Sequence, residues 1–394
     1  MTKPEFIDLF SADNRILYSD LNSPGNLPKL SRSTRDGYAV KIEREQVNLE
    51  KNIFRIMGEV RIGTLSKLAI KPGEAVKVAT GSSLPSGTNA VSMREYSEVL
   101  EGELKIIKPL KIGENIVNPG DDVKRGQLFF EAGTRLRPHN LALMSLLGIK
   151  RVTVFSKPKI AILSTGDELE DLDGKSGRKG SSARAPIFDS NRPFLSSIVP
   201  ELGGIPVDLG IARDNFDEIR SKMVEGLRYD GLFLSAGSSV GERDYVSRAA
   251  ESIRELKMLV HGVAMRPSSP TGLALCRGKP VIFLPGFPTS AIVSFYVFGR
   301  PAILKLSGNS STEMQTIQAT LDEDFDGKSG LTHFVRVHVV PNGKSYTARI
   351  VRPTEAQYSS WLKQANGIAV IGSDGRTALK RGDNVSVYLI GDTG

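Results

Sequence analysis

Apolar runs of strand length alternate with longer helix-compatible stretches through the middle of the chain. The apolar runs are Lys159 to Leu163, Ile205 to Ile211, Gly231 to Ser235 and Val281 to Leu284, and the helical stretches are Arg192 to Leu202, Phe216 to Leu227 and Thr289 to Leu306. Strands alternating with helices at this spacing are typical of a parallel sheet with helices on both faces. We therefore expect a doubly wound α/β domain here.

The region before this domain has a different pattern. Short β-prone runs, Val76 to Ala79 and Leu104 to Ile107, are separated by many glycines between Ile53 and Lys124. This pattern predicts a small β-rich domain. A short apolar stretch, Asn140 to Leu147, fits a connecting helix, and Gly148 follows where a C-terminal cap is expected.

After Thr316 only short alternating runs remain. They are Phe334 to Val340, Tyr346 to Val351, Ile368 to Ile371 and Val385 to Ile390. Such runs predict a C-terminal β-barrel or small sandwich, with Trp361 as a core residue.

Composition limits the class of protein. A length of 394 residues predicts two to four domains, and a hydrophobic fraction of 40% with 24% charged residues is typical of folded chains. The N-terminus has no apolar signal core, and no apolar segment reaches the roughly 18 residues that a membrane span needs. We expect a protein that is neither exported nor embedded in a membrane.

Charge and cysteine content refine this expectation. The 52 basic residues outnumber the 44 acidic ones, and a net charge of +8 favours anionic ligands. The basic residues are scattered, which disfavours a nucleic-acid surface. Cys276 is the only cysteine and the four histidines are dispersed, so we expect a reducing, cytoplasmic location and no zinc site.

Polar tails follow three of the predicted strands, at residues 164–168, 235–244 and 285–290. Ligands of open α/β sheets bind at the carboxyl ends of the strands, so these tails are expected to form one pocket. The small residues of the second tail, Gly237, Ser238, Ser239 and Gly241, could cradle phosphate or carboxylate oxygens. A plain strand-to-helix turn with Asp244 as the helix cap is an equally good interpretation of the second tail taken alone.

Acidic residues also gather near the predicted strand ends and helix starts. They are Asp167, Glu168, Asp189, Asp214 and Asp244. Carboxylates in such places suit Mg²⁺ and a substrate phosphate, although Asp189 and Asp214 could instead be helix N-caps. The segments 174–176 and 327–329 read Gly-Lys-Ser but lack the first glycine of a Walker A loop, which disfavours P-loop ATP hydrolysis.

These residues occur within a series of motifs. The series comprises residues 35–40 (RDGYAV), 79–91 (ATG through PSGTNAV), 120–123 (GDDV), 164–169 (STGDEL), 189–192 (DSNR) and 239–245 (SVGERDY). In this order and across nearly its whole length, the chain resembles the molybdopterin molybdenumtransferase family, that is, the MoeA proteins and the E domain of gephyrin.

The resemblance implies a multidomain architecture. It implies an elongated linking domain (residues 1–40 and 126–154), an inserted β-rich domain (41–125), a MogA-like α/β domain (155–308) and a C-terminal β-barrel (309–394). It also implies a homodimer in which the β-rich domain of one subunit approaches the α/β domain of the other. The implied reaction moves molybdenum from molybdate into adenylylated molybdopterin, with Mg²⁺-dependent release of AMP, and a molybdopterin adenylyltransferase is a possible partner protein.

The resemblance also implies roles for particular residues. The implied catalytic residues are Asp36 and Thr80, which would reach the partner's pocket, and Glu168, Asp214 and Asp244, which would also serve the metal and phosphate. The implied pterin-nucleotide residues are Ser164, Thr165, Gly166, Asp189, Asn191, Gly237, Ser238, Ser239, Gly241, Pro285, Gly286 and Pro288. The implied oxyanion residues are Arg266, Ser269, Pro270, Ser290, Arg336 and Ser359.

Two departures fall in the oxyanion region. Family members usually have Lys-Pro-Gly-Lys-Pro at residues 266–270 and Pro-Gly-Asn-Pro at 285–288, where this chain has RPSSP and PGFP. Arg266 keeps a positive charge, but Ser269 removes one, which could cost roughly a few kcal/mol of anion binding in a dry pocket. Tyr358 and Ser360 also stand where glycine and small residues are usual.

Three functions stay open at this point. The first is a transferase for molybdate or, with an altered pocket, tungstate. The second, motivated by Ser269 and Phe287, is a paralogue that binds molybdopterin or acts as a scaffold without turnover. The third is a molybdopterin adenylyltransferase, which the flanking domains disfavour because those proteins are typically the α/β domain alone.

Overall fold

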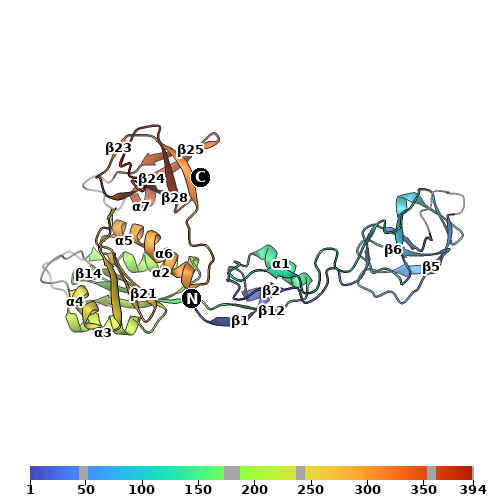
Figure 1. Cartoon of the computed structure of the whole chain (residues 1–394), viewed down its shortest axis with the longest axis horizontal. Coiled ribbons are helices and arrows are strands. Elements are labelled where there is room, and N and C mark those ends of the chain that lie inside the picture. Colours follow the sequence, from blue (N-terminus) through green and yellow to red (C-terminus); the bar gives the residue numbers. More distant parts are fainter. Residues whose placement is uncertain (44–51, 173–186, 237–244, 353–360, 393–394) are drawn as a thin grey trace.

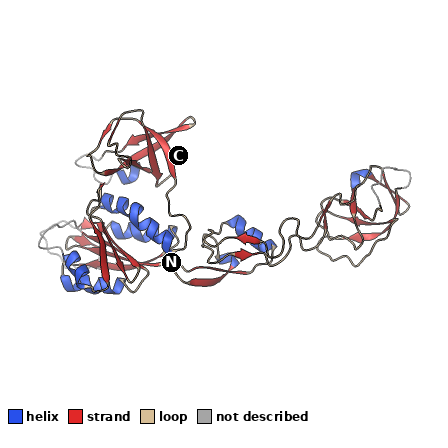
Figure 2. Ribbon diagram, viewed as in Figure 1, coloured by secondary structure: helices blue, strands red, loops and turns tan. Residues whose placement is uncertain are grey.

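The computed structural model describes residues 1–43, 52–172, 187–236, 245–352 and 361–392. The molecule is elongated (Figure 1). The α/β part and the C-terminal barrel lie at one end, a β-rich part lies at the other, and a thin arm connects them (Figures 1 and 2). The multidomain α/β architecture expected from the sequence is therefore confirmed.

The α/β part contains a six-stranded sheet with the order β16-β13-β17-β21-β20-β18. The strands are β13 (Lys159–Thr165), β16 (Ile205–Ala212), β17 (Gly231–Ala236), β18 (Leu256–His261), β20 (Gly272–Cys276) and β21 (Lys279–Pro285). The first four in the order are parallel, and β20 and β18 add an antiparallel edge. The predicted, mostly parallel sheet is confirmed, but the pattern did not predict its two edge strands.

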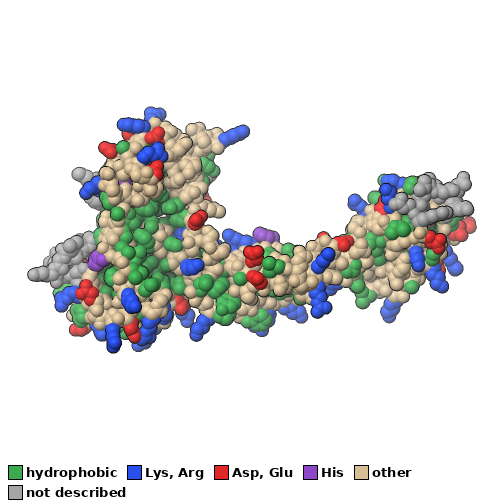
Figure 3. Space-filling view, viewed as in Figure 1, with side chains coloured by type: hydrophobic (Ala, Val, Ile, Leu, Met, Phe, Trp, Pro, Cys, Tyr) green, Lys and Arg blue, Asp and Glu red, His purple; other side chains and the backbone are tan. Residues whose placement is uncertain are grey.

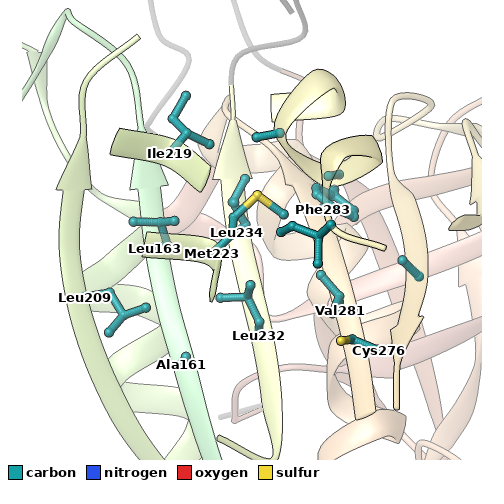
Figure 4. Packing of buried hydrophobic residues seen from close by; sticks show 14 of the residues in the cluster. Ala161, Leu163, Leu209, Ile219, Met223, Leu232, Leu234, Cys276, Val281 and Phe283 are labelled. Atoms are coloured by element: carbon teal, nitrogen blue, oxygen red, sulfur yellow. The ribbon is translucent and has the colours of Figure 1, made fainter. Parts of the chain in front are cut away.

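Helices cover both faces of this sheet. They are α2 (Asn191–Glu201), α3 (Phe216–Gly226), α4 (Tyr245–Ser252), α5 (Pro288–Ser294), a π-helix (Phe295–Gly299) and α6 (Arg300–Leu306). Ala161 and Leu163 of β13 pack in the core cluster with α3 and α4, shown in Figure 4, whereas Ile160 and Ile162 pack in the opposite cluster with α2 and Phe295. Burial on both faces explains why the parallel strands are continuous apolar runs.

The connecting arm is a ribbon formed by an outgoing and a returning segment. Strands β1 (Pro4–Asp8), β2 (Leu21–Asn22) and β3 (Arg32–Ser33) pair antiparallel with β12 (Arg151–Phe155), β11 (Leu128–Phe130) and β10 (Ile116–Val117), respectively. Helix α1 (Pro138–Leu146) packs on the ribbon. Gly148 has a φ of 79° and its N–H donates to the Ser145 carbonyl over 2.9 Å, so it is the C-terminal cap that the sequence predicted.

The β-rich part is a six-stranded sheet with the order β7-β4-β6-β5-β9-β8. Its strands are β4 (Gly37–Val40), β5 (Ile53–Val60), β6 (Glu74–Val78), β7 (Ala90–Met93), β8 (Ser97–Leu100) and β9 (Glu103–Ile106). Strand β4 pairs within this sheet although it precedes residue 41, where the inserted domain was expected to begin. The domain boundaries themselves stay a prediction.

The C-terminal part is a closed barrel. Its strands are β22 (Thr316–Leu321), β24 (Thr332–Asn342), β25 (Ser345–Ile350), β26 (Gly367–Ile371) and β28 (Asn384–Leu389). Strand β24 pairs with both β25 and β26, and β22 and β28 complete the ring, so the barrel alternative is confirmed over the sandwich. The side chain of Trp361 lies outside the described part of the structure.

Short elements complete the fold. They are β14 (Leu169–Glu170), β15 (Ile187–Phe188), β19 (Met265–Arg266), β23 (Phe325–Asp326), β27 (Ala378–Leu379), α7 (Trp361–Gln364) and the 3-10 turns Leu9–Ser11 and Arg94–Tyr96. Among them, β19 leaves the α/β part and pairs with β24, so Arg266 lies opposite His333 of the barrel. An apolar cluster that includes Met265, Val293 and Phe334 joins the two parts, and Figure 3 shows the hydrophobic surface between them.

Candidate functional site

The ends of β13 and β17 are fastened together by buried hydroxyl groups. The Ser164 and Ser235 hydroxyl oxygens lie 2.9 Å apart, and the Thr165 hydroxyl donates to the Ser235 carbonyl over 3.4 Å. Ser164 and Thr165 are both buried. Their hydroxyls hold the first two polar tails side by side, so these side chains support the candidate site from within.

Gly166 turns the chain directly after β13. Its φ is +146°, and a Cβ atom there would lie 2.7 Å from Oε1 of Glu168. Because glycine has no Cβ, the Glu168 carboxylate can fold back over the strand end. Glu168 is exposed, and its carboxylate is available to a ligand at this edge of the sheet.

Asp214 follows the neighbouring strand, β16, and joins this acidic edge. Its N–H donates to Oδ1 of Asp167 over 3.2 Å. Partial loss of hydration raises the pKa of Asp214, and the negative charges of Asp167 and Glu168 raise it further. The cap of α3 is Asn215, whose side chain accepts from two backbone N–H groups, so Asp214 is free of the capping role that the sequence also allowed.

Several predicted residues lie outside the described part of the structure. They are Gly237, Ser238, Ser239, Gly241, Asp244 and Ser359. The predicted anion-binding loop and the third predicted metal ligand, Asp244, therefore stay predictions. Among the described residues, no group of three His, Cys, Asp or Glu side chains is arranged to hold a metal ion.

Asp189 and Asn191 organise the start of α2. Oδ1 of Asp189 accepts from the N–H groups of Asn191 (3.0 Å) and Arg192 (3.3 Å), which is a capping role. Nδ2 of Asn191 donates to the Gly286 carbonyl over 2.9 Å. Asn191 thus ties α2 to the third polar tail, where Pro285 ends β21 and Pro288 begins α5.

An ion-pair group around Arg192 was not predicted. Its guanidinium contacts three carboxylates, those of Asp171, Asp189 and Asp208. The Arg192 side chain is only 13% exposed, so these acids neutralise a nearly buried charge. The motif at 189–192 contains the arginine, but nothing in the sequence pattern indicates its partners Asp171 and Asp208.

A cationic cleft opens between the barrel and β19. It has a volume of about 410 Å³ and is lined by Arg266, Pro267, Phe325, Asp326, Gly327, Lys328, His333, Phe334, Val335, Arg336, Ile350, Val351 and Arg352. Two of the predicted oxyanion residues, Arg266 and Arg336, thus meet in one cleft although they are far apart in sequence. The pKa of Arg336 is lowered because the protein removes water from its half-buried guanidinium.

The other oxyanion residues of the described part do not line this cleft. The Ser269 hydroxyl donates to the Met265 carbonyl over 2.7 Å, and Pro270 is exposed. Ser290 contributes its carbonyl, which accepts from the Ser268 hydroxyl over 2.6 Å. This bond links the segment that follows Arg266 to the third polar tail.

Lys328 and Arg352 are cleft residues that sequence reasoning missed. Lys328 belongs to a Gly-Lys-Ser segment that failed as a Walker A loop, and Arg352 follows the predicted strand 346–351. Arg352 donates to the Glu323 carboxylate over 3.1 Å. A search for basic residues at the ends of the barrel strands would have found both.

Asp36 and Thr80 form a pair in the β-rich part. Oδ1 of Asp36 accepts from the N–H (2.7 Å) and the hydroxyl (2.9 Å) of Thr80. The backbone bond from Thr80, followed by its hydroxyl, lowers the pKa of Asp36. Both residues are exposed, and their part of the molecule lies at the opposite end from the α/β part (Figure 1).

The fold and the site together define a class. The protein is a multidomain α/β protein with an acidic strand-end edge, an adjoining cationic cleft and a distant exposed Asp–Thr pair. Three family descriptions match successive parts of the chain: "MoeA N-terminal region (domain I and II)" at residues 1–148, "Probable molybdopterin binding domain" at 161–305 and "MoeA C-terminal region (domain IV)" at 318–390.

Named relatives agree with these matches. A Staphylococcus aureus protein named molybdopterin molybdenumtransferase is 29% identical, over 95% of this chain and 88% of that protein, and a Staphylococcus epidermidis protein of the same name is 28% identical over 97% and 90%. A crystal structure of the molybdopterin biosynthesis MoeA protein of Pyrococcus horikoshii OT3 superposes with a TM-score of 0.80 at 27% identity, covering 99% of this chain and 95% of that one.

The chain belongs to the MoeA family, as its motifs predicted. It is a transferase of molybdenum cofactor biosynthesis. Within the residues that the structure describes, no helix is long and apolar enough to cross a membrane.

Proposed function

We propose that the protein inserts molybdenum from molybdate, or tungsten from tungstate, into adenylylated molybdopterin and releases AMP. One observation carries this proposal: the cleft of Arg266 and Arg336 is joined to the strand-end edge of the α/β part through the Ser268–Ser290 bond. The bond connects the segment after β19 to the polar tail that follows β21, at the same end of the parallel strands as the acidic residues. The reaction requires both substrates together.

The cationic cleft suits the oxyanion. Arg266, Lys328, Arg336 and Arg352 bring four positive charges to the cleft, against the carboxylates of Asp326 in its lining and of Glu323, which pairs with Arg352. Guanidinium groups donate in a planar fork that matches tetrahedral oxyanions, and the half-buried Arg336 acts where water is partly excluded. Lys328 adds a positive charge to the lining of the cleft, and Arg352 lies there paired with Glu323.

The acidic edge suits Mg²⁺. Glu168 and Asp214 would hold the ion because carboxylate oxygens are its preferred protein ligands. The pKa of Asp214 is raised by burial and then by the charges of Asp167 and Glu168, and a bound cation would offset both effects. When bound, the ion would neutralise charge on the phosphates of the adenylylated substrate. Asn191 and Gly286 would then position the nucleotide beside this edge.

The Asp36–Thr80 pair requires a second subunit. Its part of the chain lies at the far end of the molecule from the acidic edge, so one chain does not bring these residues together (Figure 1). The arm exposes the large apolar side chains of Phe6 (57%), Phe10 (97%) and Leu146 (65%). Exposed apolar groups of this size favour contact with another chain. We infer an antiparallel homodimer in which Asp36 and Thr80 complete the partner's site.

The test of this function is the release of AMP. The purified protein would be incubated with adenylylated molybdopterin and Mg²⁺, with molybdate, with tungstate or with neither, and AMP would be measured over time. We expect release that depends on Mg²⁺ and on at least one oxyanion. Tight pterin binding without AMP release under any of these conditions would contradict the proposal.

A further inference from the structure

A second basic cavity lies where the arm meets the α/β part. Its volume is about 350 Å³. It is lined by Asp13, Asn14, Arg15, Ile16, Arg135 and Arg137 of the arm, by Phe155, Ser156 and Lys157, and by Pro200, Glu201, Leu202, Gly203, Ser307 and Asn309 near the ends of α2 and α6. We call it the junction cavity. It is separate from the cleft of Arg266 and Arg336, with which it shares no lining residue.

Two arginines of the junction cavity have only neutral partners. Arg135 donates to Oδ1 of Asn309 over 3.1 Å, and Arg137 donates to Oδ1 of Asn14 over 3.1 Å. Within the described ranges, neither guanidinium has a carboxylate at ion-pair distance. Arg135 is half-buried, which makes an uncompensated charge there costly.

Arg135 and the neighbouring Arg300 both lie where burial disfavours a positive charge. Burial lowers the pKa of Arg135, and the charge of Arg137 lowers it further. The pKa of Arg300 is likewise lowered, by burial and then by the charge of Arg135. A bound anion in the cavity would offset both effects at Arg135, the cost of burial and the nearby charge of Arg137.

The arginines are not needed to cap the two helices that end here. At the end of α2, the N–H groups of Gly203 and Gly204 donate to the carbonyls of Pro200 and Val199. At the end of α6, the N–H groups of Gly308 and Asn309 donate to the carbonyls of Lys305 and Leu304. The last turns are thus closed by the backbone. The two helix dipoles together offset only about one positive charge.

We propose that the junction cavity binds a small multivalent anion of phosphate chemistry. The two guanidinium forks can donate several charge-assisted hydrogen bonds, and Lys157 adds a charge at the rim. The cavity volume accommodates a diphosphate or the phosphate end of a nucleotide. Since its walls come from both the arm and the α/β part, a bound anion ties the two together and fixes the direction of the arm that carries Asp36.

The experiment measures anion binding at the junction cavity while anion binding at the cationic cleft is weakened. The background is the full chain with Arg266→Gln and Arg336→Gln, which weakens anion binding at the cleft. Inorganic pyrophosphate and AMP are titrated in separate arms at low salt by calorimetry. We expect at least one probe to bind with a component that the junction-cavity variants described next remove, apart from any AMP bound at the proposed nucleotide site beside the acidic edge. Such a component for pyrophosphate indicates free phosphates as the source, and for AMP alone it indicates a nucleotide. Binding of neither probe overturns the proposal.

Variants of the junction cavity locate the remaining site. Arg135→Gln with Arg137→Gln is expected to weaken binding by about tenfold or more, as is the single charge reversal Arg137→Glu at an exposed position. Arg349→Gln, an exposed arginine of the barrel, is the matched control and should leave affinity unchanged. Melting temperatures confirm folding of each variant. Equal affinity in the Arg137→Glu variant and the control overturns the proposal.

Discussion

At the scale of single residues, the charge of Arg336 is central to the proposed oxyanion site. Replacing it with glutamine removes one of the four cations and a half-buried donor from the cleft. We expect Arg336→Gln to raise the Kd for molybdate by about tenfold or more, because charge-assisted bonds in partly dry sites are strong. Isothermal titration with molybdate measures this. Arg349→Gln is the control, and an unchanged Kd for Arg336→Gln would exclude the cleft as the oxyanion site.

The raised pKa of Asp214 predicts how the stability of the protein depends on pH. An acid whose pKa is raised on folding binds its proton more tightly in the folded state, so its contribution to stability is greatest at low pH and is lost as pH rises through the raised pKa. Asp214→Asn should therefore melt above the wild-type protein at pH 7, and the difference should vanish below about pH 4. Thermal melts across this range in metal-free buffer measure it. Asp217→Asn, in the first turn of α3, should show no such gain; a gain independent of pH would contradict the assignment.

The candidate site residues that the sequence predicted differ from those that it missed in what brings them together in the fold. Glu168 and Asp214 follow strong apolar strands, so the topology of a parallel sheet was enough to bring them together. Arg266 and Arg336 meet because a two-residue strand, β19, pairs with β24. No local pattern predicts so short a pairing; the family resemblance supplied these two residues, and it did not supply Lys328 or Arg352.

At the scale of elements, close packing of two strands explains the glycine in the motif at residues 35–40. Gly37 of β4 faces β7, where a Cβ atom would lie 1.9 Å from the Ser92 carbonyl oxygen. Gly37→Ala should therefore force β4 and β7 apart and lower the free energy of unfolding of the β-rich part by about 2 kcal/mol or more. Chemical denaturation of the full chain measures this.

Gly25→Ala is the matched control. A Cβ atom at Gly25 has no neighbour within 4 Å, and the backbone there does not require glycine. We expect the control to unfold like the wild-type protein. Similar unfolding of both variants would mean that β4 and β7 can separate without cost.

The elements that the sequence predicted correctly were those with a single clear pattern of apolar positions. The continuous apolar runs of the parallel strands could be recognised because both faces are buried. The edge strand β18 could not, since Met258, Leu259 and Val260 are exposed and give no alternation of buried and polar positions. The helix expected at 289–306 is α5, a π-helix and α6 in succession, and it was found because its apolar content is continuous.

At the scale of the whole molecule, the β-rich part and the α/β part lie at opposite ends of the same chain (Figure 1). The Asp36–Thr80 pair is exposed and ordered by its own hydrogen bonds, but it lies away from the acidic edge and the cationic cleft of the same chain (Figure 1). The proposed composite site therefore combines the β-rich part of one subunit with the α/β part of another. The motifs indicated both sets of residues, whereas their separation became visible only in the fold.

Subunit mixing tests this central claim most directly. Asp36→Asn and Asp214→Asn proteins, each expected to release little AMP alone, would be unfolded, mixed in equal amounts and refolded. Half of the random dimers would then be mixed, and each would contain one intact site, so about a quarter of wild-type AMP release should return. Wild-type protein taken through the same procedure is the control. Recovery near this fraction is the predicted result, and no recovery in a mixture shown to contain mixed dimers would contradict the composite site.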